Sequence, residues 1–228
     1  MKGMDLIQAF TDPATVSSYA DATPQRVPGF ADLHRMALIL LSEKASDAAH
    51  ILVLGAGGGL ELKTFAEARP YWSFTGVDPS APMLDLARQI LGPLGSQVQW
   101  VPGYVDDAPL GPFDGATCLL TLHFLPRPER LRVLQALHQR LKPGARLIVA
   151  HHSTPQDDEP ERWLTRSAAF ASGAQVDFAR AGASAVVMAE QLPLLSTGEE
   201  EALLAEAGFF DVALFYAGFS FRGWVAVA

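Results

Sequence analysis

A group of glycines after a short apolar run is the feature of this sequence with the clearest chemical potential. Residues 51–54 are all apolar, and Gly55-Ala56-Gly57-Gly58-Gly59 follows them directly. Glycines placed just after a strand let the backbone turn tightly and approach a ligand without a Cβ in the way. A plain tight turn would show the same pattern, so the loop alone does not decide between the two.

A single carboxylate, Asp78, follows the next apolar run. Residues 72–77 read as a second strand, and Asp78 is the first polar residue after it. A carboxylate at the tip of a second strand can accept hydrogen bonds from both ribose hydroxyls of an adenosine. Asp78 could instead, or in addition, cap the helix expected from Ala81. Together with the glycine loop, it predicts a site for an adenosine-containing ligand.

The spacing of the glycines bears on which adenosine ligand is bound. A dinucleotide loop reads G-x-G-x-x-G/A, and its last small residue lets the helix pack beneath the pyrophosphate. Counted from Gly55 and Gly57, that position is Leu60, while an additional glycine stands at position 59. The pattern therefore favours a ligand without a pyrophosphate, and it opposes a nicotinamide oxidoreductase.

Alternating strands and helices are predicted to position these residues. Residues 1–48 read as helical, with breaks at Pro13, Pro24 and Pro28. The predicted strands are 51–54, 72–77, 98–101, 116–121, 147–150, 212–216 and 219–228, the last two forming an antiparallel pair. One predicted helix follows the glycine loop and ends at about residue 68, and a second covers 81–91. A third covers 126–141 and ends at a Lys142-Pro143-Gly144 turn. The last begins at a Ser196–Glu199 capping box and stops at Gly208. Residues 153–195 are less regular and read as helical pieces that cover the site.

This order of elements predicts an α/β fold of the Rossmann-like, doubly wound kind. The expected sheet is mostly parallel and seven-stranded, with an antiparallel C-terminal hairpin and an N-terminal helical cap, and its ligands lie at the carboxyl ends of the strands. We expect one domain over 1–228: a cap over 1–48, a cofactor-binding core over 49–152, a substrate lid over 153–195, and a closing helix and hairpin over 196–228.

The motifs resemble those of class I S-adenosylmethionine-dependent methyltransferases, whose first motif reads V-L-D-x-G-x-G-x-G. Gly55, Gly57 and Gly59 match it, while Val53 stands where that family has an acidic residue. Asp78 matches the ribose-binding acid. Gly103-Tyr104-Val105 stands at a G-D-A motif, which implies Tyr104 packing on adenine and the Val105 amide donating to a ring nitrogen. The cofactor-binding residues that the resemblance implies are Gly55, Ala56, Gly57, Gly59, Asp78, Pro79, Met83, Tyr104, Val105, Leu119 and Thr121.

Both ends of the chain resemble one branch, the carboxy-S-adenosylmethionine synthases. The similar segments are 24–30 (PQRVPGF) and 216–225 (YAGFSFRGWV). That branch has a carboxylate-binding arginine before its last helix, whereas residues 182–196 here contain no Arg or Lys. A buried carboxylate without a cation is costly. Ordinary S-adenosylmethionine, S-adenosylhomocysteine as product, and methyl transfer are therefore favoured. A carboxy-S-adenosylmethionine synthase-like enzyme and a non-catalytic S-adenosylmethionine-binding partner subunit remain alternatives.

Three histidines follow or end predicted strands at the expected ligand edge: His123, His151 and His152. Methyl transfer from a sulfonium mainly requires alignment of the acceptor, and a general base is needed only where the acceptor must lose a proton. Any of the three could take that proton, or each could be structural, so no catalytic residue is assigned. Neighbouring residues on a strand point to opposite faces, so His151 and His152 do not by themselves predict a metal site.

Composition narrows the partners. Lys and Arg number 17 against 25 Asp and Glu, for a formal charge of −8, which disfavours nucleic acid. Arg127, Arg130, Arg132 and Arg140 are expected on a solvated helix face, and Cys118 as a buried, inert thiol. No signal peptide or membrane-spanning run is read, so a cytoplasmic enzyme is expected. The expected partners are a small-molecule methyl acceptor and, as an open question, a second copy of the chain in a homodimer.

Overall fold

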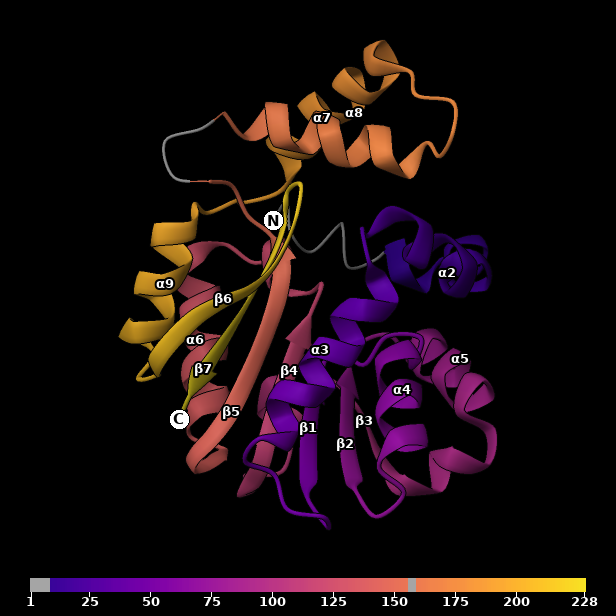
Figure 1. The fold of residues 1–228 in the computed structure, drawn as a ribbon. Helices are drawn as coiled ribbons and strands as arrows, with labels where there is room; N and C mark the ends of the chain where they lie inside the picture. Colours follow the sequence, from indigo (N-terminus) through magenta and orange to yellow (C-terminus); the bar gives the residue numbers. More distant parts are fainter. Residues whose placement is uncertain (1–8, 156–158) are drawn as a thin grey trace.

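A computed structural model describes residues 9–155 and 159–228 of the chain. Its centre is one sheet in the order β3-β2-β1-β4-β5-β7-β6 (Figure 1). The neighbours from β3 to β5 pair in parallel, whereas β7 is antiparallel to both β5 and β6. The strands are β1 His50–Leu54, β2 Ser73–Asp78, β3 Val98–Pro102, β4 Phe113–Leu119, β5 Leu141–His152, β6 Phe210–Gly218 and β7 Phe221–Val227. The predicted fold class, including the antiparallel C-terminal hairpin, is confirmed.

Helices cover the sheet and its carboxyl edge (Figure 1). The α-helices are α2 Pro13–Arg26, α3 Phe30–Ser42, α4 Leu60–Ala68, α5 Ala81–Leu91, α6 Arg127–His138, α7 Pro160–Ala171, α8 Phe178–Gln191 and α9 Thr197–Glu206. Short 3-10 turns are η1 Ala9–Thr11, η2 Gly92–Gln97, η3 Val105–Asp107 and η4 Leu122–Phe124. Helices α7 and α8 lie beyond the carboxyl ends of the parallel strands, and α2 lies beside them (Figure 1).

The core consists of two apolar clusters on opposite faces of the sheet. Along β1, Leu52 and Leu54 belong to the cluster shared with α6 and α9, while Ile51 and Val53 belong to the cluster shared with α3, α4 and α5. Side chains alternate between the faces of a strand, so a strand buried on both sides must be apolar throughout. This is the physical reason for the uninterrupted run of apolar residues before the glycine loop.

The sequence placed a turn at residues 142–144 and the start of the next strand at residue 147. This boundary is wrong, because β5 already begins at Leu141. Phe113 pairs with Leu141 and Gly115 pairs with Arg146, so β5 holds extra residues opposite β4. Gly144 takes a positive φ of 83° there, and its N–H donates to the Ala228 carbonyl at 2.7 Å. The Pro-Gly geometry is thus taken up by a bulge within the strand.

The N-terminal segment is helical as predicted, but Pro24 does not break it. Helix α2 runs from Pro13, which occupies its first turn, through Pro24 in its last turns. The carboxylate of Asp12 caps the helix by accepting from the Thr15 amide at 2.9 Å. The first eight residues lie outside the described part of the chain.

The prediction of a solvated arginine face on α6 is wrong for two of its four members. Arg130 is fully buried, where it pairs with Glu200 of α9 and donates to the Pro193 carbonyl at 2.9 Å. Arg140, just beyond α6, is also buried and donates to the Ala136 carbonyl at 2.9 Å. A buried guanidinium is tolerated where a carboxylate or carbonyls satisfy its N–H groups.

Cys118 is buried as predicted, and burial raises the pKa of its thiol. The helices of the described residues include none long and apolar enough to cross a membrane.

Candidate active site

The glycine loop leaves the end of β1 and is tied to the neighbouring strand. The amides of Gly55 and Ala56 both donate to the Val77 carbonyl, at 2.8 and 2.9 Å. Gly57 has a φ of +48°, in the left-handed region that L side chains rarely adopt. The loop therefore sits at the carboxyl end of β1, beside the end of β2, as the sequence predicted.

The three motif glycines meet different neighbours. A Cβ on Gly55 would collide with the hydroxyl of Thr121, and a Cβ on Gly59 would lie 2.8 Å from the Cβ of Ala87 on α5. Both positions are therefore restricted by the packing of the protein itself. A Cβ on Gly57 would lie 3.3 Å from the Tyr19 hydroxyl and 3.7 Å from Met83 Cε, so this glycine faces the space between the loop, α2 and α5.

Asp78, the last residue of β2, is held by two backbone amides. Its Oδ2 accepts from the Gly57 amide at 2.8 Å and its Oδ1 from the Ser80 amide at 2.9 Å. Burial raises the pKa of Asp78, and the two amides act in the opposite direction. A carboxylate has about four acceptor sites, so both oxygens keep capacity for further donors. The alternative that Asp78 caps α5 is wrong, because Ser80 is the cap and its Oγ accepts from the Met83 amide at 3.3 Å.

Helix α2 covers the glycine loop with an aromatic side chain that sequence reasoning missed. A Cβ on Gly58 would lie 2.8 Å from Tyr19 Cδ1, so the ring rests on the loop. Burial, and then the nearby Asp78 and Glu61, raises the pKa of Tyr19 to about 12. The Ser80 hydroxyl donates to the Phe10 carbonyl at 2.7 Å and fixes the start of this cover. Tyr19 gave no signal because no apolar stripe marks α2.

Glu61, in the first turn of α4, is a second residue that the sequence did not single out. Its side chain is 7% exposed, and its Oε1 has no hydrogen-bond partner among the described residues. Burial raises the pKa of Glu61 to about 7, and the neighbouring Thr117 hydroxyl lowers it only in part. An unpaired buried carboxyl at the foot of the glycine loop costs stability.

The remaining predicted cofactor residues lie along the same edge with different roles. Tyr104 is 49% exposed, whereas the side chains of Val105 and Leu119 belong to the core, which leaves only their backbone for a ligand. Pro79 is exposed and Ala56 buried. The hydroxyl of Thr121 donates to the Leu119 carbonyl at 3.0 Å. The structure thus brings Gly57, Asp78 and Met83 together, and Gly55 with Thr121.

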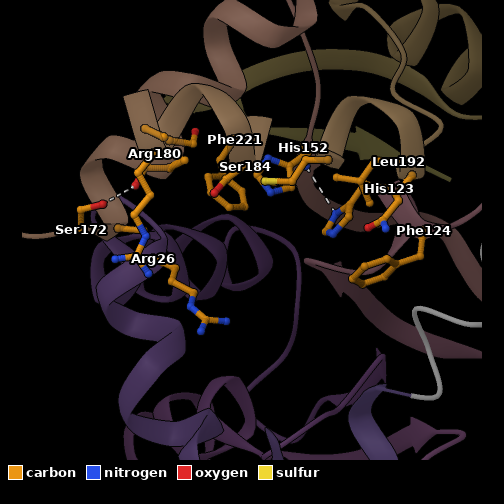
Figure 2. A pocket seen from close by; sticks show the side chains of 15 residues that line it. Arg26, His123, Phe124, His152, Ser172, Arg180, Ser184, Leu192 and Phe221 are labelled. Atoms are coloured by element: carbon orange, nitrogen blue, oxygen red, sulfur yellow. Dashed lines mark hydrogen bonds between the residues drawn. The ribbon is translucent and has the colours of Figure 1, made fainter. Parts of the chain in front are cut away.

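A cavity of about 620 Å³ lies between the sheet edge, α2, α7 and α8 (Figure 2). It is lined by Arg26, His123, Phe124, His152, Ser167, Ala168, Ala171, Ser172, Arg180, Ala181, Ser184, Met188, Gln191, Leu192 and Phe221. Phe124 packs on Phe10 at 5.9 Å between ring centroids, and Phe10 packs on Tyr19 at 6.2 Å. A row of packed rings therefore joins the wall of the cavity to the cover of the glycine loop.

The structure separates the three histidines. His123 and His152 line the cavity, but His151 points to the other face, where its Nε2 lies 2.9 Å from Glu200 Oε1. His152 Nδ1 lies 2.8 Å from Ser220 Oγ, which lies 2.6 Å from Ser167 Oγ. Burial, and then His151, lowers the pKa of His152 to about 3; burial also lowers the pKa of His123. Both cavity histidines are therefore neutral at pH 7.

Two cations outside residues 182–196 line the cavity. Arg180 stands two residues before that segment, on α8, and Arg26 is the last residue of α2. Both guanidinium groups reach the cavity (Figure 2). Residues 182–196 hold no cation, as the sequence shows, so the cationic groups of the cavity come from α2 and from the start of α8.

The residues of the loop fit a nucleoside ligand better than a metal ion. Within residues 9–155 and 159–228, no group of three His, Cys, Asp or Glu is placed to hold a metal. The loop offers the opposite features: backbone that a Cβ would obstruct at Gly57 and a buried carboxylate with unused acceptor sites at Asp78.

Sequence comparisons place this architecture among known proteins. Residues 52–147 match the family model described as a methyltransferase domain. A carboxy-S-adenosyl-L-methionine synthase of Chromohalobacter salexigens is 27% identical over 166 residues, which cover 71% of this chain and 62% of that protein. Another of the same name, from Dichelobacter nodosus, is 25% identical over 95% of this chain and 91% of its own length. The resemblance of the chain to this branch is confirmed.

Solved structures agree on the fold. A putative O-methyltransferase from Nostoc punctiforme superposes with a TM-score of 0.69 at 19% identity, over 95% of this chain and 60% of that one. Human N-acetylserotonin methyltransferase, solved with S-adenosylmethionine, gives 0.61 at 19% identity, over 85% of this chain and 51% of that one. This chain thus spans half to two thirds of these structures. It has the Rossmann-like fold of class I S-adenosylmethionine-dependent methyltransferases, and residues 52–147 match the model of a methyltransferase domain.

Proposed function

We propose that this chain binds S-adenosylmethionine along the Gly57–Asp78 edge and transfers its methyl group to a small molecule held in the cavity under α7 and α8. The observation that carries the proposal is the contact between the two halves of the motif. The Gly57 amide donates to Asp78 at 2.8 Å, so loop and carboxylate form one surface at the carboxyl edge of the sheet. Ligands of open α/β sheets bind at this edge.

The cofactor is positioned by backbone and carboxylate rather than by a pyrophosphate loop. Asp78 accepts the ribose hydroxyls with the acceptor sites that Gly57 and Ser80 leave unused. Tyr104, half exposed after β3, packs on the adenine ring. Gly57 allows the methionine portion to pass close to the backbone. Tyr19 lies over the loop and excludes water from that passage.

The acceptor is oriented by the cavity, in which the neutral ring of His152 accepts a hydrogen bond from the reacting group. S-Adenosylmethionine supplies an electrophilic methyl group, so the protein's part is alignment. When His152 Nδ1 donates to Ser220 Oγ, its Nε2 keeps a lone pair for the acceptor. Because burial depresses the pKa of His152 to about 3, the ring stays neutral at pH 7 and orients the acceptor by a hydrogen bond rather than taking its proton. His123 Nδ1 is occupied by the His152 amide at 3.4 Å, which favours His152 over His123.

Ligand binding tests the cofactor half of the proposal. Calorimetric titration should show S-adenosylhomocysteine binding in the micromolar range and no binding of NAD, and the bound ligand should raise the melting temperature by mass action. Heat of binding with NAD alone, or no heat with either ligand, would refute the proposed site. Incubation with methyl-labelled S-adenosylmethionine and a panel of small acceptors tests the transfer half; label must leave the cofactor and appear in an acceptor.

A second candidate is the synthesis of carboxy-S-adenosylmethionine, favoured by the names of the curated relatives. The same labelling experiment separates it, because in that reaction the methyl carbon stays on the cofactor and gains a carboxyl group. Mass spectrometry of the cofactor pool therefore decides between the two. A chain that binds S-adenosylhomocysteine and turns over in neither assay would be a non-catalytic partner subunit.

A further inference from the structure

Two arginines enter the cavity without a counter-ion. Among residues 9–155 and 159–228, neither the Arg26 nor the Arg180 guanidinium forms an ion pair or a hydrogen bond. Several other arginines of the described chain form ion pairs, for example Arg127 with Glu206 at 2.6 Å and Arg146 with Glu43 at 3.2 Å. In a chain with an excess of eight acidic residues, two unpaired guanidinium groups in one cavity are unusual.

The elements around the two arginines do not neutralise them. The residues that line the cavity include no Asp or Glu. Asp177, the acid three residues before Arg180, accepts from the Arg180 backbone amide at 3.0 Å as the cap of α8, and it makes no ion pair with the guanidinium. The two groups come from different parts of the chain, α2 and α8, yet they converge at one end of the cavity (Figure 2).

The other end of the cavity has different chemistry. His123 and Phe124 lie away from the arginines, with His152 and Phe221 between the two ends (Figure 2). The wall there carries no charged group: its polar side chains are the neutral imidazoles of His123 and His152 and the uncharged Ser167 and Gln191. A cavity of about 620 Å³ suits a small organic molecule. The molecule that matches both ends has an anionic group at one end and a flat apolar body with a nucleophilic atom at the other.

We infer that the methyl acceptor is a small carboxylate, bound through its carboxylate by Arg26 and Arg180, with its nucleophilic atom directed to His152. This inference rests on the proposed function and names the substrate class for the same site. Guanidinium groups bind carboxylates by planar, often bidentate hydrogen bonds. Because both arginines are exposed at the cavity mouth, their field also attracts an anion into an otherwise acidic protein, and binding weakens as salt rises.

The test uses pairs of probes that differ only in charge. Hydroxyaryl carboxylates, beginning with 4-hydroxybenzoate, are compared with their neutral carboxamides by calorimetry on the full chain saturated with S-adenosylhomocysteine. At least one acid should bind about tenfold or more tightly than its amide. Arg26→Gln and Arg180→Gln should each reduce acid binding about tenfold and leave amide binding unchanged. Arg35→Gln, an exposed arginine on α3 outside the cavity, is the matched control and should change neither.

Several results would overturn the inference. It fails when no acid of the panel binds up to 10-millimolar concentrations (about the limit for such weak ligands), when the amides bind as well as the acids, or when the two variants bind acids like the parent. It also fails when the variants lose affinity for carboxy-S-adenosylmethionine but not for the acids, because the anionic group would then belong to the cofactor. In each case retained binding of S-adenosylhomocysteine keeps the proposed function intact, whereas its loss in the parent protein refutes that function instead.

Discussion

Substitution of Gly57 by alanine tests the cofactor site most directly, because two separable costs can be read from the structure. The first is conformational: at a φ of +48° an alanine costs about 1–2 kcal/mol relative to glycine. The second is steric. The new Cβ would lie 3.3 Å from the Tyr19 hydroxyl, closer than most real Cβ contacts, and 3.7 Å from Met83 Cε, beside the proposed path of the cofactor. Gly57 is buried beneath α2, so some loss of stability is expected.

A control variant must share the first cost without the second. Gly144 has a φ of +83° and nothing within 4 Å of its Cβ position, and it lies in the bulge at the start of β5. Gly115 looks suitable from the sequence but is not, because a Cβ there would lie 2.7 Å from Leu41 Cδ2 in the core. Urea unfolding should therefore show both Gly57→Ala and Gly144→Ala destabilised by about 1–2 kcal/mol.

Affinity for S-adenosylhomocysteine separates the two variants. Calorimetry should show that Gly57→Ala weakens binding by at least about tenfold, or 1.4 kcal/mol, while Gly144→Ala binds like the parent. Equal affinities in the two variants would mean that Gly57 serves only the turn and that the cofactor lies elsewhere.

Three further predictions concern Asp78 and Glu61 at the site and the buried His34 on α3. Asp78→Asn should weaken S-adenosylhomocysteine binding by about 2 kcal/mol in calorimetry, since the charge-assisted bonds to the ribose are lost; parental affinity would leave Asp78 with a structural role only. Burial raises the pKa of Glu61 from 4.5 to about 7, so the charged carboxylate destabilises the folded parent increasingly as pH rises through that window. Relative to the parent, Glu61→Gln should therefore raise the free energy of unfolding by about 2 kcal/mol more at pH 8 than at pH 5. The exposed Glu67→Gln is the control and should show no such difference. Burial lowers the pKa of His34 from 6.5 to about 4, so the folded state, which keeps the ring neutral, loses stability as pH falls below 6.5. In urea unfolding, the free energy of unfolding of the parent should fall by about 2 kcal/mol more between pH 7 and pH 5 than that of His34→Leu.

The sequence predicted those parts of the site that are formed by residues close to one another along the chain. The apolar run before the glycines, the carboxylate after the second strand and the capping box at Ser196 are each defined within a few residues, and each is confirmed as a structural feature. The opposite directions of His151 and His152 follow from strand geometry alone. For these elements, neighbouring residues and the period of the backbone suffice.

The missed features depend on partners far along the chain. Arg130 reads as solvated until Glu200, 70 residues later, comes to lie against it in the core. Tyr19 and Arg26 gain their meaning only when α2 folds over the loop and the cavity, and Arg180 only when α8 closes the other side. Burial of a charge depends on whether the fold supplies a partner, and sequence spacing carries no record of that partner.

Helix α2 connects the two halves of the site through simple geometry. Tyr19 and Arg26 are seven residues apart, which on an α-helix is about 10 Å along the axis and nearly the same face. One rigid face therefore presents an aromatic ring to the glycine loop and a guanidinium to the cavity. A distance of about 10 Å also leaves room for the reactive end of the cofactor and a small acceptor to lie next to each other along the helix. Because the two contacts share one helix, a displacement of α2 must change cofactor and acceptor binding together, whereas substitution of either residue changes one.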